Sequence, residues 1–112
     1  MTVEEMNTKL YEKMYAEQEE FEQKLLSMEP REVLDHAYEY YIREDLLMEM
    51  EEHHLAGKQC RALLKLNAPL EALYDRWLKI KDSHMEEIRD MIESYADDLA
   101  REEQLRADRE AR

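Results

Sequence analysis

Residues that break regular structure are almost absent from this chain. Its 112 residues include one glycine, Gly57, and two prolines, Pro30 and Pro69. Proteins built from strands and tight turns need far more glycine and proline than this. The chain is therefore expected to be all-α: a small helical bundle, divided at these three residues into three long helices and one short connecting helix.

The first and second predicted helices differ in how sharply their apolar residues select a face. Thr2 and Glu5 form a capping box that starts the first helix. Its apolar residues recur every three, four or seven positions in one narrow stripe: Val3, Met6, Leu10, Met14, Phe21, Leu25 and Met28. From Pro30, the second helix is expected to use Val33, Leu34, Ala37, Tyr38, Tyr41 and Met48 for its core side. Its flanks carry further apolar surface from Tyr40, Ile42, Leu46 and Leu47, so this helix is either central in the bundle or covered by a partner.

The second half of the chain predicts a short helix and then the longest one. The short helix runs from about Gly57 to Leu66, and Pro69 opens the long one. An apolar stripe then continues to Leu99, and its expected core residues are Leu70, Leu73, Trp77, Ile80, His84, Ile88, Met91, Tyr95 and Leu99. Residues 1–99 are therefore expected to form one domain. Residues 100–112 are expected to be a charged, frayed helical tail held by acid and base pairs four positions apart.

Acidic residues are concentrated in the first half of the chain. Residues 1–54 contain 16 acids and 5 bases, a formal charge of −11, whereas residues 55–112 contain 13 acids and 11 bases, a formal charge of −2. Such an imbalance opposes compaction, so a basic partner is one explanation and a solvated helix face is the other. The candidate partner-binding acids on the first helix are Glu12, Glu17, Glu19, Glu20 and Glu22. Glu17 falls inside the apolar stripe, where it either reaches the bundle edge or meets a partner.

Three tyrosines in the second helix provide a candidate aromatic surface: Tyr38, Tyr40 and Tyr41. Tyrosine is common both in cores and at interfaces, so core packing and partner binding both stay open. The surplus apolar surface of this helix also leaves a homodimer as an alternative.

The sequence lacks a complete set of residues for catalysis, for metal binding or for cofactor binding. Glu51 and His54 have the Glu-x-x-His spacing of di-iron helical bundles, but His36 and His84 lack the matching glutamate, and His53 and His54 lie off the core stripe. Cys60 is a lone cysteine with no evident base, and its solitary presence suits a reducing compartment. One glycine cannot make a phosphate-binding loop. We therefore expect no enzyme activity, no metal and no cofactor.

Charge and hydropathy also limit the partner and the location. A formal net charge of −13 disfavours direct binding to nucleic acid, and it suits a protein that occupies the Lys and Arg groups of a nucleic-acid-binding partner. No apolar run approaches the roughly 20 residues needed to cross a bilayer, and the first residues do not have the pattern of a signal peptide. A soluble, cytoplasmic protein is expected.

Seven stretches of the chain carry a resemblance to a known family: residues 10–14, 16–20, 32–40, 43–45, 62–64, 69–70 and 88–93. They resemble an uncharacterised family of small acidic helical proteins from conjugative and other mobile elements of Gram-positive gut bacteria. The resemblance implies a mobile-element context, in which small acidic proteins include anti-restriction and anti-CRISPR inhibitors. It implies no catalytic residues. The expected function is a non-enzymatic acidic inhibitor or adaptor that binds a basic surface of a nuclease or another nucleic-acid-handling protein, and the alternative is a structural homo-oligomeric module.

Overall fold

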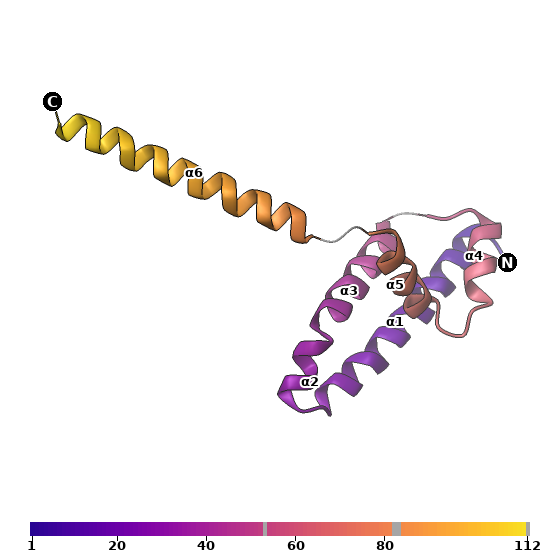
Figure 1. Ribbon diagram of the computed structural model, residues 1–112. Helices are drawn as coiled ribbons and strands as arrows, with labels where there is room; N and C mark the ends of the chain where they lie inside the picture. Colours follow the sequence, from indigo (N-terminus) through magenta and orange to yellow (C-terminus); the bar gives the residue numbers. More distant parts are fainter. Residues whose placement is uncertain (53, 82–83, 112) are drawn as a thin grey trace. The chain divides into compact units, whose positions relative to one another are not determined.

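The computed structural model describes residues 1–52, 54–81 and 84–111, and every regular element in these ranges is a helix. The elements are α1 Val3–Leu26, α2 Pro30–Asp35, α3 Ala37–Glu52, α4 Gly57–Leu64, α5 Pro69–Ile80 and α6 Met85–Glu110 (Figure 1). The expected all-α class is confirmed. Contacts divide the chain into two units, Met1–Ile80 with α1 to α5 and Lys81–Arg112 with α6.

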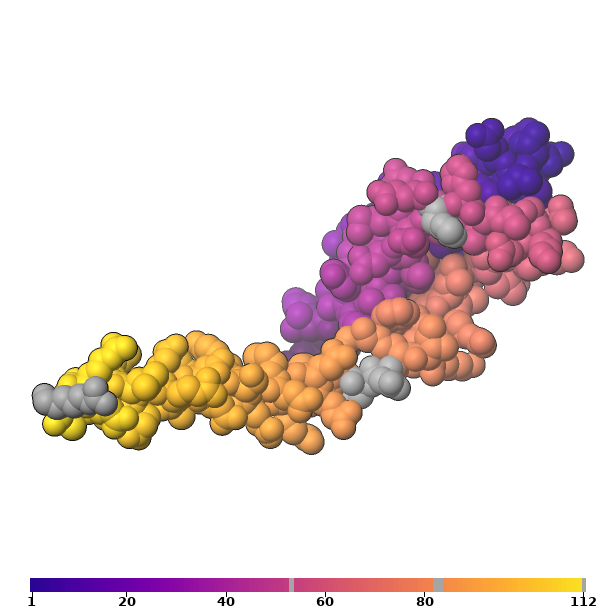
Figure 2. Space-filling model, turned by 90° about the horizontal axis from the view of Figure 1, so that it is seen from above, coloured from indigo at the N-terminus to yellow at the C-terminus, as the bar shows by residue number. Residues whose placement is uncertain are grey.

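The first unit is built around α1, which packs against α3, α4 and α5. The N-cap half of the predicted capping box is present, because the Glu5 backbone N–H donates to Thr2 Oγ1 at 3.0 Å. The Glu5 carboxylate accepts from the Thr2 hydroxyl at 3.1 Å. Figure 2 shows the start of α1 against α4, and α3 beside α5. The apolar stripe of α1 supplies half of the main buried cluster, which comprises Met6, Leu10, Met14, Leu47, Cys60 and Leu70. The apolar stripe of α1 thus lies at the centre of the first unit.

Two charged side chains of α1, one helical turn apart, fix the connection between α4 and α5. Lys13 Nζ donates to the backbone carbonyls of Leu64, at 3.0 Å, and Leu66, at 2.6 Å. Glu17 Oε1 accepts from the Leu70 N–H at 2.8 Å, and Glu17 Oε2 accepts from the Glu71 N–H at 3.0 Å. A cation therefore meets the carbonyl end of α4 and an anion meets the amide end of α5, as the helix dipoles favour. The polar positions of α1 position α4 and α5 as much as its apolar stripe does.

The predicted second helix is two helices, which meet at His36. The backbone there has φ −104° and ψ 5°, and the His36 N–H bonds back to Val33 and Leu34. His36 also approaches the edge of the Phe21 ring, with the ring centroids 6.2 Å apart. This chain segment contains no glycine, and its only proline, Pro30, opens α2, so nothing in its sequence marks the bend. The bend is accompanied instead by the contact of His36 with Phe21 of α1.

The predicted core face of the second helix is also wrong. Leu34, Tyr41 and Met48 are 67%, 62% and 60% exposed, while Ile42 and Leu47, expected on the flanks, are buried. Apolar residues surround much of this segment, so their periodicity does not select one face. Packing against α1 and α5 selects it.

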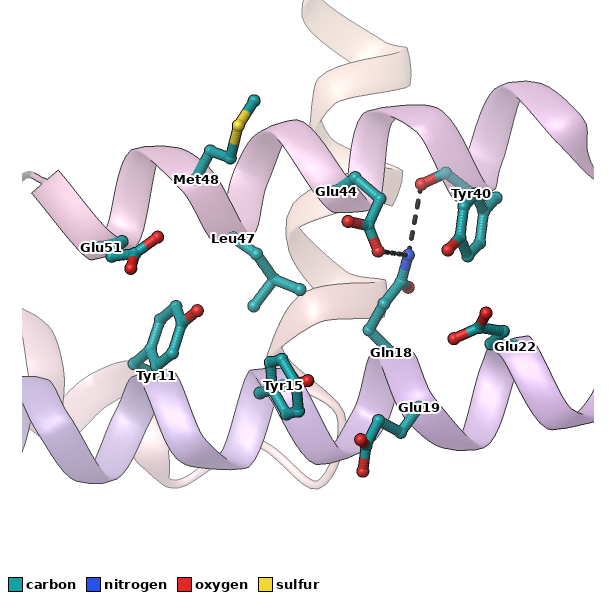
Figure 3. Close-up of a pocket in the computed structure, with 10 residues that line it drawn as sticks. All are labelled: Tyr11, Tyr15, Gln18, Glu19, Glu22, Tyr40, Glu44, Leu47, Met48 and Glu51. Atoms are coloured by element: carbon teal, nitrogen blue, oxygen red, sulfur yellow. Dashed lines mark hydrogen bonds between the residues drawn. The ribbon is translucent and has the colours of Figure 1, made fainter.

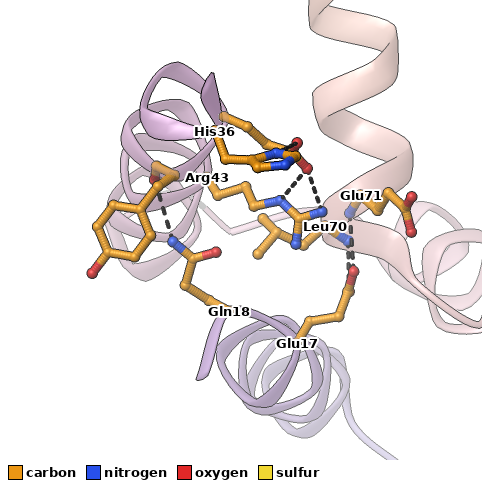
Figure 4. A network of polar contacts seen from close by, with 8 residues as sticks. Glu17, Gln18, His36, Arg43, Leu70 and Glu71 are labelled. Atoms are coloured by element: carbon orange, nitrogen blue, oxygen red, sulfur yellow. Dashed lines mark hydrogen bonds and ion pairs between the residues drawn. The ribbon is translucent and has the colours of Figure 1, made fainter. Parts of the chain in front are cut away.

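A buried arginine occupies the interior side of α3 beside the bend. Arg43 is 5% exposed, and its guanidinium lies 4.2 Å from the centroid of the Phe21 ring. It donates from Nε and from a terminal nitrogen to Glu39 Oε2, at 3.0 and 2.7 Å. Figure 4 shows the Arg43 guanidinium and its polar contacts. Burying a guanidinium is favourable only with such pairing. One cation of the acidic half is therefore already neutralised inside the fold.

The predicted last helix is likewise two helices, because α5 ends at Ile80 and α6 starts at Met85. The expected core stripe fails from the last residue of α5 onward: Ile80 is 65% exposed, and Leu99 in α6 is 47% exposed. His84 is an exposed residue at the start of α6 and not a core histidine. Trp77 is partly buried, and its Nε1 donates to the Tyr38 hydroxyl at 3.0 Å.

The second unit is the single helix α6, which has no buried residue. It continues without interruption past Leu99, the predicted domain boundary, to Glu110. The contacts divide the chain after Ile80 instead. Its apolar side chains recur at spacings of four, three and four and are all at least 44% exposed: Ile88, Ile92, Tyr95 and Leu99.

Candidate functional site

The five predicted acids of α1 do not share one face. Successive helical residues are 100° apart, and Glu19 and Glu22 lie toward α3, whereas Glu12 lines a separate cavity at the start of α1. Glu20 is exposed elsewhere on the helix. Glu17 faces α5, and both its carboxylate oxygens accept backbone N–H groups there (Figure 4). The structure therefore assigns Glu17 a capping role and leaves Glu19 and Glu22 as the predicted acids beside the cavity between α1 and α3.

That cavity is a groove of about 330 Å³ between α1 and α3. We call it the tyrosine–carboxylate groove. Four carboxylates and three phenols line it, and none of its lining residues is basic (Figure 3). The lining residues are Tyr11, Tyr15, Gln18, Glu19, Glu22, Tyr40, Glu44, Leu47, Met48 and Glu51.

A buried amide forms part of the groove and holds one of its carboxylates in place. Gln18 is only 3% exposed, and its Nε2 donates to the Tyr40 carbonyl at 3.2 Å and to Glu44 Oε1 at 3.1 Å (Figure 3). Its Oε1 is buried without a hydrogen-bond partner among the described residues. A buried acceptor without a partner is uncommon in folded proteins. The groove thus combines an oriented carboxylate with an unused acceptor.

The negative charge of the groove acts on its own tyrosines. Burial raises the pKa of Tyr11, and the carboxylates of Glu51 and Glu44, together with Tyr15, raise it further. Burial likewise raises the pKa of Tyr40, and the charges of Glu44 and Glu22 add to it. At neutral pH these phenols are protonated, so each offers one O–H donor beside the carboxylates. The groove is a concentrated anionic site with aromatic walls.

The raised tyrosine pKa values predict a loss of stability at high pH. Unfolded tyrosines ionise near pH 10, whereas Tyr11 and Tyr40 keep their protons to higher pH in the folded protein. Above about pH 10 the unfolded state binds fewer protons, so the free energy of unfolding falls as pH rises. Tyr11→Phe and Tyr40→Phe should make this fall shallower in urea unfolding measured at several pH values. Tyr41→Phe, at an exposed site outside the groove, is the control. An equal slope for all three variants would contradict the prediction.

The three predicted tyrosines of the second helix are not brought together. Tyr40 lines the groove, whereas the Tyr38 ring lies toward α5, with its centroid 6.4 Å from that of Tyr74. Tyr41 is exposed and lines neither the tyrosine–carboxylate groove nor its neighbouring cavities. Tyr40 stands two positions from Tyr38 and one from Tyr41, and residues one or two positions apart do not share a helix face, which explains why Tyr40 alone of the three lines the groove.

Four of the seven carboxylates and tyrosines that line the groove were missed from the sequence: Tyr11, Tyr15, Glu44 and Glu51. A signal for them exists, because Tyr11, Tyr15, Gln18 and Glu22 follow spacings of four, three and four beside the core stripe of α1. On α3, Tyr40, Glu44 and Glu51 share a face through spacings of four and seven. Each of these two stripes can be recognised in the sequence of its own helix. Their juxtaposition depends on how α1 and α3 pack.

This arrangement is suited to holding a cation. Guanidinium and ammonium groups form charge-assisted hydrogen bonds with carboxylates and favourable contacts with aromatic faces. Among the described residues, no three His, Cys, Asp or Glu side chains are placed to hold a metal ion. His54 is exposed, and His53, the other histidine of the candidate metal step, lies outside the described residues. The expected absence of a metal and of a cofactor stays a prediction.

No helix of the described ranges is long and apolar enough to span a membrane.

Comparison with known proteins identifies a family and no individual relative. No curated protein matches the sequence, and no solved structure matches the fold. One family, described as protein of unknown function (DUF3848), matches residues 6–100 and so includes the whole tyrosine–carboxylate groove. The chain belongs to this DUF3848 family.

Proposed function

We propose that this protein is a non-enzymatic binding module that uses the tyrosine–carboxylate groove to hold Lys or Arg side chains of a basic protein surface. The observation that carries the proposal is the composition of the groove, in which Glu19, Glu22, Glu44 and Glu51 surround three tyrosines with no basic residue. Four like charges in one groove oppose folding. A cationic partner relieves that repulsion.

The position of the groove agrees with the charge imbalance of the chain. All four carboxylates lie within residues 1–54, which have a formal charge of −11. Arg43, the basic residue nearest to them on α3, is turned into the fold and paired with Glu39. The negative electrostatic potential of the acidic half is therefore available to an external cation. Its long-range attraction would also accelerate association.

Within this proposal, the partner is a nuclease or another nucleic-acid-handling protein, and the protein acts as its inhibitor. Proteins that bind phosphate backbones display clustered Lys and Arg groups, which carboxylates on two neighbouring helices can occupy. The resemblance to acidic mobile-element proteins supports an anti-restriction or anti-CRISPR role, carried by such an element and exerted in the cytoplasm. Direct binding to nucleic acid is not part of the proposal.

Charge neutralisation inside and outside the groove tests the proposal. The groove variant carries Glu22→Gln, Glu44→Gln and Glu51→Gln, and the control carries Glu93→Gln, Glu102→Gln and Glu103→Gln on exposed positions of α6. Both variants change the net charge equally, and Gln has nearly the helix propensity of Glu. Fluorescence anisotropy with a short oligo-arginine peptide should show the groove variant binding at least about tenfold more weakly than the control, about 1.4 kcal/mol.

Salt provides the second measurement of the same experiment. Raising the ionic strength should weaken the parent and the α6 control more steeply than the groove variant, since exposed charges are screened over roughly 8 Å at physiological salt. If the two triple variants lose equal affinity, the acid acts only through net charge and the groove is not the site.

A structural homo-oligomeric module without an inhibitory role is the alternative function. The exposed apolar stripe of α6 favours it, because spacings of four, three and four are those of a coiled-coil seam. This alternative predicts a mass that rises with concentration in light scattering and falls to the monomer value in an Ile92→Glu variant. It predicts no dependence on Glu22, Glu44 or Glu51.

A further inference from the structure

A second, apolar groove lies at the turn between α1 and α2. It has a volume of about 680 Å³. Leu26 and Leu34 within it are 72% and 67% exposed, and no residue of α2 is buried. Leu26 and Leu34 thus leave apolar surface at one end of the unit that the core does not use. The groove is lined by Glu22, Leu25, Leu26, Met28, Pro30, Val33, Leu34, Ala37 and Tyr40.

The two grooves adjoin at Glu22 and Tyr40, which line both of them. Along α1 the combined surface runs from Tyr11 to Leu26. At 1.5 Å per residue this is roughly 22 Å, or about four helical turns. One end is anionic and aromatic, and the other end is apolar.

We infer that this combined surface is a docking site for an amphipathic, arginine- or lysine-rich helix of a partner protein. The inference rests on the proposed function and specifies what the partner presents. Its basic side chains lie among Glu22, Glu44 and Glu51, and its apolar side chains fill the space beside Leu26 and Leu34. A purely basic segment leaves the apolar groove empty, and a purely apolar segment leaves the carboxylates unpaired.

The elements that form the surface favour a helix over an extended strand. α1, α2 and α3 satisfy their backbone hydrogen bonds internally, so they present side chains and no free strand edge. A groove between two packed helices accepts the ridge of a third helix. Recognition therefore follows the helix-in-groove mode, in which anchors recur every three or four residues.

Charge complementarity excludes the chain's own helices as the occupant. α6 carries 10 acids and 4 bases, so the α6 of a second copy would be repelled by the groove. α4 has a basic composition, but its central Cys60 is fully buried in the core of the same unit. The cationic helix must come from another protein.

Two peptides of equal composition, together with oligo-arginine, test the inference. One peptide orders Arg and Leu with helical amphipathicity, one scrambles that order, and the oligo-arginine peptide tests charge alone. The parent protein should bind the amphipathic peptide at least about tenfold more tightly than the scrambled one. A Leu26→Ser, Leu34→Ser variant should lose this preference and still bind oligo-arginine like the parent. Both leucines are exposed, so the variant should keep its fold, which circular dichroism checks. An Ile88→Ser, Leu99→Ser variant of α6 is the matched control and should retain the preference.

The outcomes separate the inference from the proposed function. Binding of oligo-arginine with no preference for the amphipathic order overturns the docking helix and leaves the groove as a cation site. No binding of oligo-arginine overturns the proposed function itself. Self-association that is abolished by Leu26→Ser and Leu34→Ser makes a second copy the occupant, which also overturns the inference.

Discussion

Leu10→Ala is expected to lower the free energy of unfolding by about 3 to 5 kcal/mol, a large fraction of the roughly 5 to 15 kcal/mol typical of a domain. Leu10 is completely buried in the main cluster, where Met14, Cys60 and Leu70 are also fully buried. Its removal leaves a cavity on the central helix, to which α3, α4 and α5 all pack. Urea unfolding followed by circular dichroism measures the change.

The matched control for Leu10 is Leu26→Ala on the same helix. Leu26 is 72% exposed, so its truncation should change stability by less than about 0.5 kcal/mol. Similar losses at both positions would show that α1 is not the centre of the core.

Asn7→Ala is expected to cost about 2 to 4 kcal/mol, although it removes only a small polar side chain. Asn7 is 6% exposed and makes three hydrogen bonds at 2.9 Å: its Nδ2 donates to the carbonyls of Val3 and Leu55, and its Oδ1 accepts from the Leu55 N–H. Alanine leaves both backbone groups of Leu55 without these partners. The connection between α3 and α4 is then released from α1.

The chain offers a matched control in its other asparagine, Asn67, which is exposed. Asn67→Ala should leave stability within about 0.5 kcal/mol of the parent. Hydrogen exchange gives a local measurement, because the Leu55 amide should lose protection in Asn7→Ala and not in Asn67→Ala. An unchanged Leu55 amide would show that Asn7 does not hold the connection.

The sequence predicted the candidate site only in part. Glu19, Glu22 and Tyr40 were identified and do line the groove, whereas Glu17 caps α5 and Tyr38 contacts α5. The partners of these residues on the opposite helix, above all Glu51, were missed. Each contributing stripe follows helical spacing within its own helix. Which stripe of α3 faces which stripe of α1 is a property of packing and has no local signal.

The sequence by itself determined the fold class, the start of α1 and the apolar stripe that makes α1 central, because these depend on local spacing and on the scarcity of glycine and proline. Only the tertiary structure decided the bend at His36, the face of α3 that is buried, and the end of the core at Ile80. In these segments apolar residues surround the helix or continue without a partner, so periodicity allows several solutions. Contacts with α1 select one of these solutions for α3, and that choice places Glu44 and Glu51 opposite Tyr11 and Tyr15 and creates the groove.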